Sequence, residues 1–139
     1  MNEPENVVDK AIRSVITVIV GLATIVMVQI YLNWTWHDDY EPWFLNSVYG
    51  MEVTEAAMFV VALLTALFQV SPVLRTAVSF SVGSYVGMIV YLAIIGGPGN
   101  LGPIVPIFGI IFIAPSVFLG AYIGHFLNQR LRIRASTTK

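Results

Sequence analysis

Charged side chains are missing from two long stretches of this 139-residue chain. No charged residue lies between Arg13 and Asp38, and none lies between Arg75 and Arg130. A helix rises about 1.5 Å per residue, so about 20 apolar residues cross the roughly 30 Å of hydrocarbon in a bilayer. Only 11% of the residues are charged and 57% are hydrophobic, whereas soluble domains carry about 25% charged residues. The chain therefore reads as an integral membrane protein.

The uncharged stretches predict an all-α, polytopic membrane protein with four transmembrane helices in a compact bundle. A third gap separates Glu55 from Arg75, and the turn sequence GGPGNLGP at 96–103 divides the longest gap in two. Open strands leave backbone groups unsatisfied in lipid, and no period-two alternation is present. The expected spans are about 12–34, 51–72, 75–95 and 104–128, with an outer loop at 35–50 and a basic tail at 129–139.

The basic residues predict the orientation of this bundle. All seven lie in the N-terminal segment, in the loop between the second and third spans, or in the C-terminal tail. Lysine and arginine accumulate in cytoplasmic loops, so we expect both termini in the cytoplasm and the chain in a prokaryotic plasma membrane. The first apolar segment lacks a small-residue cleavage site and is expected to remain as a signal anchor. No internal repeat is evident, so residues 1–139 are expected to form one domain.

Small residues recur at four-residue spacing in the last two predicted helices. They are Ser79, Gly83 and Gly87 in the third helix, and Ser116, Gly120 and Gly124 in the fourth. In an antiparallel hairpin that turns near residues 101–102, the two stripes lie at matching depths. Small residues allow helix backbones to approach closely in lipid. We predict that the stripes pack against each other, and the alternative is that one of them packs against another subunit.

A proline interrupts the fourth predicted helix. Pro115 has no backbone N–H, so the Ile111 carbonyl loses its helical hydrogen bond and a kink is expected there. Such a kink serves either as a gate or as a bend in a packing element. The absence of a polar path beside Pro115 in the sequence favours the bend.

The segment NWTWHDDYEPWF at 33–44 concentrates acidic and aromatic residues. Carboxylates and an imidazole are suitable ligands for a metal ion, which makes His37, Asp38, Asp39 and Glu41 a candidate metal site. Consecutive loop residues rarely converge on one ion, however. Tryptophan and tyrosine settle at the headgroup level of a bilayer, so Trp34, Trp36, Tyr40 and Trp43 are better explained as an interfacial belt.

Three polar side chains fall at or near membrane depth, and these are candidates for transport or polar contact. Glu52 and Glu55 begin the second predicted helix, and Gln29 lies in the first helix at a depth similar to Glu55. Ionisable groups inside a membrane are functional candidates. The simpler interpretation is helix capping by Glu52 and a hydrogen bond between Gln29 and Glu55.

The sequence contains no catalytic motif, and we predict that the chain is not an enzyme. Cysteine is absent, which excludes disulfides and thiolate chemistry. No cofactor and no nucleic acid is expected, whereas lipid contacts are. We expect a non-catalytic accessory subunit that packs with unlike subunits in a membrane protein complex, rather than a homo-oligomer. The alternative is a small homo-oligomeric channel or transporter with Glu55 and Gln29 on its path, and the third hypothesis is a metal-bearing component that uses the outer loop.

Overall fold

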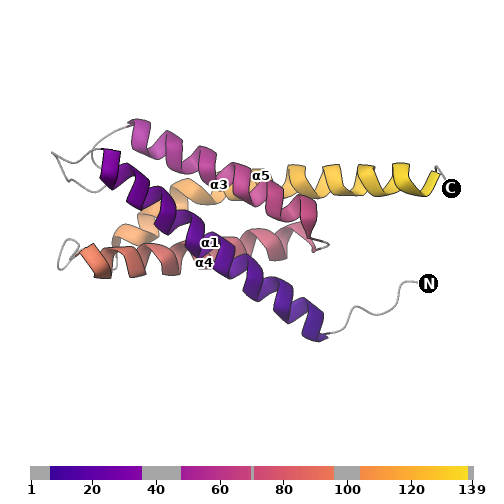
Figure 1. Cartoon of the computed structure of the whole chain (residues 1–139), viewed down its shortest axis with the longest axis horizontal. Coiled ribbons are helices and arrows are strands. Elements are labelled where there is room, and N and C mark those ends of the chain that lie inside the picture. Colours follow the sequence, from indigo (N-terminus) through magenta and orange to yellow (C-terminus); the bar gives the residue numbers. More distant parts are fainter. Residues whose placement is uncertain (1–6, 36–47, 70, 96–103, 138–139) are drawn as a thin grey trace.

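The computed structural model describes residues 7–35, 48–69, 71–95 and 104–137, and nearly all of these residues lie in four α-helices. The helices are α1 (Val7–Thr35), α3 (Val48–Phe68), α4 (Val73–Ile95) and α5 (Ile104–Thr137). They form an elongated bundle in which the start of α1 and the end of α5 lie at the same end (Figure 1). The prediction of an all-helical protein is confirmed for the described residues.

Three of the four helices are long and apolar enough to cross a membrane. The candidate spans are Val7–Leu32 in α1, Val73–Ile94 in α4 and Ile111–Ile133 in α5. These helices support the prediction that the chain is associated with a membrane. Helix α3 is not a candidate span, so the structure supports three of the four spans that the sequence predicts.

The bounds of α3 differ from those of the predicted second span. The sequence prediction rests on the uncharged gap between Glu55 and Arg75, but α3 ends at Phe68 and the rest of the gap belongs to a turn and to α4. The Thr76 N–H donates to the Pro72 carbonyl oxygen at 3.1 Å, which marks the start of helical bonding in α4. The 13 residues Ala56–Phe68 that follow the last carboxylate rise about 20 Å as a helix, and all 21 residues of α3 rise about 30 Å.

Helix α5 is longer than the sequence predicts. The expected span ends at residue 128, whereas α5 continues to Thr137, so most of the predicted basic tail is helical. Pro115 lies inside this helix. Figure 1 shows α5 bent in its orange part, the part of the chain that contains Pro115. The bend is the one expected where proline removes a backbone hydrogen bond.

The most extensive helix contacts join α1 to α4 and α3 to α5. The two helices of each pair point in the same direction along the bundle (Figure 1). A methyl group added at Gly83 would collide with the Val18 carbonyl, and one added at Gly21 would collide with the Phe80 carbonyl. One added at Gly87 would lie 2.8 Å from the Leu22 carbonyl oxygen. The backbones of α1 and α4 therefore touch where they cross, and only glycine allows this approach.

The same close approach joins α3 to α5. Methyl groups added at Gly120 and Gly124 would collide with the carbonyls of Phe59 and Leu63. The sequence predicts that the glycine stripes of α4 and α5 face each other, but the stripe of α4 faces α1 and that of α5 faces α3. Ser79 and Ser116 are half-buried. Matching depth is a property of one hairpin, and it does not decide which neighbour a stripe faces when each helix has several neighbours.

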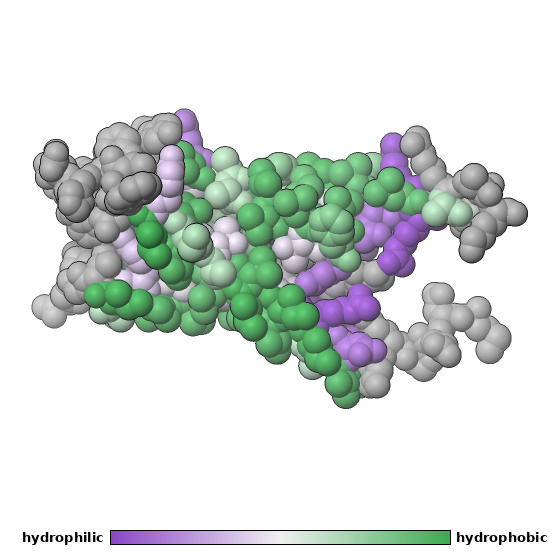
Figure 2. Space-filling view, in the orientation of Figure 1, coloured by the Kyte–Doolittle hydropathy of each residue, from purple (hydrophilic) through white to green (hydrophobic). Residues whose placement is uncertain are grey.

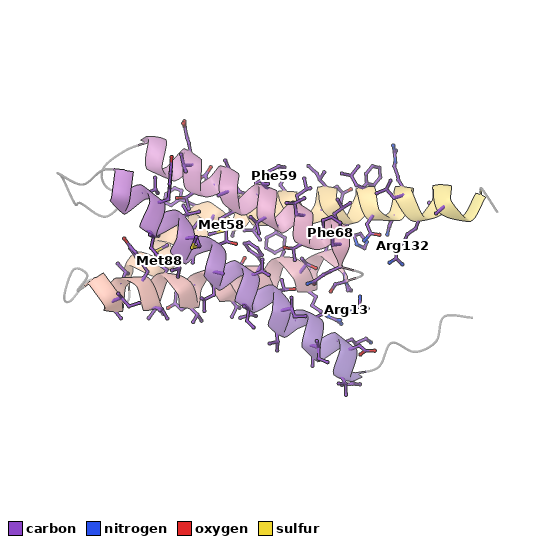
Figure 3. The ribbon with its side chains drawn as sticks, viewed as in Figure 1. Arg13, Met58, Phe59, Phe68, Met88 and Arg132 are labelled. Atoms are coloured by element: carbon purple, nitrogen blue, oxygen red, sulfur yellow. The ribbon has the colours of Figure 1, made fainter. Side chains whose placement is uncertain are left out.

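Apolar side chains fill the middle of the bundle. The largest fully buried ones include Ile25, Met58, Phe80, Met88 and Val117, and they belong to one cluster that draws on all four helices. Met58 and Met88 lie between the helices in Figure 3. The visible outer surface over the same region is also apolar, as the green atoms in Figure 2 show. Apolar residues both inside and outside are typical of a bundle whose solvent is lipid.

The two parallel helix pairs, α1 with α4 and α3 with α5, pack with similar offsets along the sequence. On α3 and α5 the offset is 61 residues, since Phe59 meets Gly120 and Leu67 meets Asn128. On α1 and α4 it is close to this value, and Tyr91 reaches the Gln29 carbonyl 62 residues away. At an offset of 62 the segment AIRSVITVIVG at 11–21 aligns with VLRTAVSFSVG at 73–83, with arginine, valine and glycine shared at equivalent positions. The tertiary contacts thus reveal a correspondence between the halves that the sequence analysis did not find.

Candidate functional site

Polar side chains gather where the start of α1 and the end of α5 lie, seen as the purple atoms at the right of Figure 2. We call this part of the molecule the basic end. Among the side chains that the structure describes, the cationic ones here are Lys10 and Arg13 of α1, Arg75 of α4, and Arg130 and Arg132 of α5. Among the described residues its only carboxylate is Asp9, which is exposed. The basic end therefore has a strong excess of positive charge.

Asn128 connects α5 to the last turn of α3. Its Nδ2 atom donates to the Leu67 carbonyl oxygen at 2.8 Å and lies 3.5 Å from the carbonyl oxygens of Ala66 and Gln69. The last carbonyls of a helix have no partner within the helix, so Asn128 caps α3 from outside. Arg132 Nε donates to Asn128 Oδ1 at 2.9 Å, and this bond orients the amide.

A second polar contact joins α1 to the residue that follows α3. Thr17 is 2% exposed, and its Oγ1 lies 2.9 Å from Gln69 Oε1 and 2.8 Å from the Arg13 carbonyl oxygen. The threonine hydroxyl can donate to either acceptor. Together with the Asn128 contacts, these bonds link α1, α3 and α5 in one polar layer at the basic end.

Arg75 and Thr76 lie in the first turn of α4. The Arg75 Nη1 atom is buried, and no hydrogen-bond partner for it exists among the described residues. The same is true of Thr76 Oγ1, and Thr76 is only 1% exposed. Buried polar groups are almost always hydrogen-bonded. These two adjacent residues therefore carry buried hydrogen-bond donors without acceptors among the described residues, which is rare in protein interiors.

The outward side of α5 at the basic end makes local contacts. The Arg130 guanidinium carbon lies 4.4 Å from the centre of the Phe126 ring, within the range of a cation–π contact. His125 Nε2 lies 2.9 Å from Gln129 Nε2 one turn later. Arg130 and Gln129 are exposed. These contacts stabilise the surface of a single helix and bring no second element into the site.

The predicted polar site at the opposite end is only partly assembled. Gln29 is 3% exposed, and its Nε2 has no partner among the described residues, so it donates no hydrogen bond to Glu55. Glu55 is half-buried and Glu52 is exposed. Tyr91 donates from its hydroxyl to the Gln29 backbone carbonyl at 3.4 Å. The predicted hydrogen bond between Gln29 and Glu55 is therefore wrong, and Gln29 holds a buried amide without a donor contact.

The candidate metal site lies outside the described residues. His37, Asp38, Asp39 and Glu41 all fall in the segment 36–47. Within the described ranges no three histidine, aspartate or glutamate side chains come together as metal ligands.

The chain matches no protein-family model, no curated protein and no solved structure. Its function must therefore be argued from its own residues.

Sequence reasoning missed the polar layer at the basic end. Asn128, Gln69 and Arg75 are ordinary polar residues near helix ends when the sequence is read along the chain. The offset of 62 residues is the signal that could have found part of the layer, because it aligns Arg13 with Arg75. The contacts of Asn128 with α3 come only from tertiary packing.

Proposed function

We propose that the chain is a non-catalytic integral membrane subunit that packs beside unlike subunits in a larger membrane protein complex. The observation that carries this proposal is one face of α5, which we call the Tyr122 face. It consists of Ile111, Pro115, Phe118 and Tyr122, all of which are exposed. Their spacing of four, three and four residues places them on one side of the helix.

Two polar groups on the Tyr122 face support a partner helix rather than lipid alone. Pro115 leaves the Ile111 carbonyl without its helical hydrogen bond. Tyr122 is 62% exposed, and helical side chains lean toward the start of their helix, which directs its hydroxyl away from the basic end. An unsatisfied polar group costs several kcal/mol in hydrocarbon. A transmembrane helix of another subunit with hydroxyl or amide side chains would satisfy both groups.

Photo-crosslinking of the intact complex tests this proposal. We would place benzoylphenylalanine at position 118 on the Tyr122 face, and at position 27 on α1 as a control, since Met27 is 66% exposed. Position 118 is expected to crosslink to a single unlike protein, and position 27 mainly to lipid. Native mass spectrometry in mild detergent should then give that partner in a fixed ratio. Crosslinks from position 118 only to a second copy of this chain, or equal crosslinks from both positions, would refute the proposal.

We also propose that α3 crosses the membrane and that both termini are cytoplasmic, in a prokaryotic plasma membrane. The support is that α3 runs beside α5 from Phe59 to Leu67, which meet Gly120 and Asn128 of a candidate span. The segregation of basic residues at one end gives the direction. Because the chain lacks cysteine, single cysteines at positions 38 and 139 can be labelled selectively. Labelling from the same side of the membrane would refute the four-span topology.

Gln29 supports a second candidate function, a homo-oligomeric channel or small-solute transporter. Its Nε2 is a buried donor without a partner among the described residues, as expected for a group that meets a passing solute. The apolar cluster around Phe80 and Met58 fills the middle of the bundle, so a path past the buried Gln29 would require these side chains to move apart. Liposome flux that is lost in Glu55→Gln would favour this candidate. A purified chain that conducts nothing, or a flux that Glu55→Gln leaves unchanged, would remove the path through Glu55.

A further inference from the structure

Arg75 carries a positive charge, and the described residues offer no partner to one of its guanidinium nitrogens. Its Nη1 atom is buried without a partner among the described residues. It also lies in the first turn of α4, where the helix dipole is positive and repels a cation. Arg75 as a whole is half-buried, and a buried donor without a partner is costly. An anion from outside the chain would remove both penalties at once.

The groups beside Arg75 are donors as well. Thr76 Oγ1 is buried without a partner among the described residues, and its hydroxyl can donate. The N–H groups that precede Thr76 in α4 have no acceptor within the helix, and such N–H groups at a helix start favour anions. The Arg75 Nη1 atom, the Thr76 hydroxyl and the first N–H groups of α4 are all donors at the start of one helix, and phosphate oxygens accept from donors of each kind.

Two further arginines lie at the level of Arg75. The register of α1 and α4 places Arg13 opposite Arg75, since Gln29 and Tyr91 meet at the same offset of 62 residues. The polar layer connects Arg132 to this level through Asn128, Gln69 and Thr17. In the view of Figure 3, the Arg13 and Arg132 side chains both lie between the diverging ends of α1 and α5. Three helices thus bring arginines to one end of the bundle.

We propose that Arg75 and Thr76, with Arg13 and Arg132 around them, bind the phosphate group of an anionic phospholipid. The planar fork of a guanidinium matches phosphate oxygens, and clustered arginines attract anionic lipid surfaces. Three helices of this bundle are long enough to cross a membrane, which places the basic end in the headgroup layer where such phosphates are concentrated. This site is independent of the Tyr122 face and goes beyond the role of an accessory subunit.

Lipid binding to the purified full chain tests the site. The delipidated protein in detergent is titrated with phosphatidylglycerol, with zwitterionic phosphatidylcholine or with inorganic phosphate, and bound lipid is counted by native mass spectrometry. Arg75→Gln removes the positive charge and the buried Nη1 donor, and Thr76→Val removes the hydroxyl at similar volume. Arg130→Gln is the matched control, because it makes the same change in net charge at an exposed arginine over Phe126.

We expect Arg75→Gln to weaken phosphatidylglycerol binding about tenfold, the lower range for loss of a charge-assisted hydrogen bond. Thr76→Val should weaken it by a smaller factor, and Arg130→Gln by less than about twofold, as for an exposed charge. Phosphatidylcholine should bind at least tenfold more weakly than phosphatidylglycerol. Millimolar inorganic phosphate should compete weakly, which identifies the lipid headgroup as the source of the anion.

Several results would overturn the proposal. Equal losses in Arg75→Gln and Arg130→Gln would show that only the overall charge of the basic end matters. Equal binding of the two lipids would show that the net negative charge of the headgroup does not matter, which contradicts a site for an anionic phospholipid. Complete displacement by inorganic phosphate would show that the site takes free phosphate instead.

Thermal melting separates ligand binding from a purely structural role of Arg75. Without lipid, Arg75→Gln should melt at the same temperature as the unmodified chain or higher, because it removes a charged group whose buried Nη1 atom has no partner among the described residues. With phosphatidylglycerol, the unmodified chain should gain more stability than the variant. A variant that is less stable in both conditions by the same amount would refute the site.

Discussion

Helix pairing through glycine can be tested by adding single methyl groups at Gly83, Gly21 and Gly120. Gly83 and Gly21 lie at the crossing of α1 and α4, and each faces the backbone of the other helix. Gly120 lies at the separate contact of α3 with α5. If the structure is right, Gly83→Ala and Gly21→Ala act on one interface, while Gly120→Ala acts on another.

The expected size of each effect follows from the distances at the crossing. A methyl group at Gly83 would lie 2.8 Å from the Val18 carbonyl carbon and 2.9 Å from its Cα. Nonbonded carbon atoms rest about 3.5–4.0 Å apart, so the helices must separate by roughly 0.6 Å or more. Overpacking of this kind costs about 1–3 kcal/mol, and the better helix propensity of alanine offsets up to about 1 kcal/mol. Each single substitution should therefore destabilise the fold by about 1–2 kcal/mol.

The double variants distinguish the two possible pairings of the glycine stripes. Once one methyl group has separated α1 from α4, the second meets more room. Gly21→Ala with Gly83→Ala should therefore cost less than the two single effects combined, by about 1 kcal/mol. Gly83→Ala with Gly120→Ala should be additive within about 0.5 kcal/mol, because the two sites share no contact.

Reversible unfolding in mixed micelles, with the fraction of the denaturing detergent varied and helix content followed by circular dichroism, measures these free energies. Ala23→Val is the control, since it adds bulk to an exposed position two residues from Gly21. It should change the free energy of unfolding by less than about 0.5 kcal/mol. Strong coupling between Gly83 and Gly120, with additivity between Gly21 and Gly83, would mean that the stripes of α4 and α5 face each other after all.

Two further substitutions test buried polar groups. Asn128→Ala should destabilise the fold by about 1–3 kcal/mol in the same unfolding assay, because it leaves the last carbonyls of α3 without a donor; the neighbouring exposed Gln129→Ala should cost less than about 0.5 kcal/mol, and equal effects would contradict the capping role. Gln29→Leu keeps a similar volume and removes an amide whose Nε2 has no partner among the described residues, so stability should stay the same or rise by about 1 kcal/mol. A loss of more than about 1 kcal/mol would show that the Gln29 amide is paired in the membrane.

The sequence predicts some helices of this bundle better than others. The uncharged runs around α1 and α4 exceed the thickness of a bilayer, so their helical state follows from the need to satisfy backbone groups internally. The span expected at 51–72 depends on an uncharged gap, and a gap does not show where one helix stops and the next begins. The structure ends α3 at Phe68 and begins α4 at Val73. Only the backbone hydrogen bonds around that turn show which residues belong to α3 and which belong to α4.

The candidate site was still less predictable. The sequence predicts a hydrogen bond between Gln29 and Glu55 because the two residues lie at similar depths on their helices. A hydrogen bond also requires the two side chains to face each other. The Gln29 Nε2 atom makes no hydrogen bond with any described residue. In the sequence, Arg75 is a loop charge that indicates the orientation of the protein. The burial of its Nη1 atom is visible only once neighbouring helices surround it.

Composition and charge spacing by themselves predicted a helical membrane protein with four spans and with its cations at one end; the structure supports three of these spans. These are properties of single segments, set by length and by the cost of placing charge in lipid. Tertiary structure decided which helices touch, so that the glycines of α4 meet α1 and those of α5 meet α3. It also decided which polar groups are paired, because in lipid the choice of neighbour depends on the fit between helix surfaces rather than on hydrophobicity, which all these helices share.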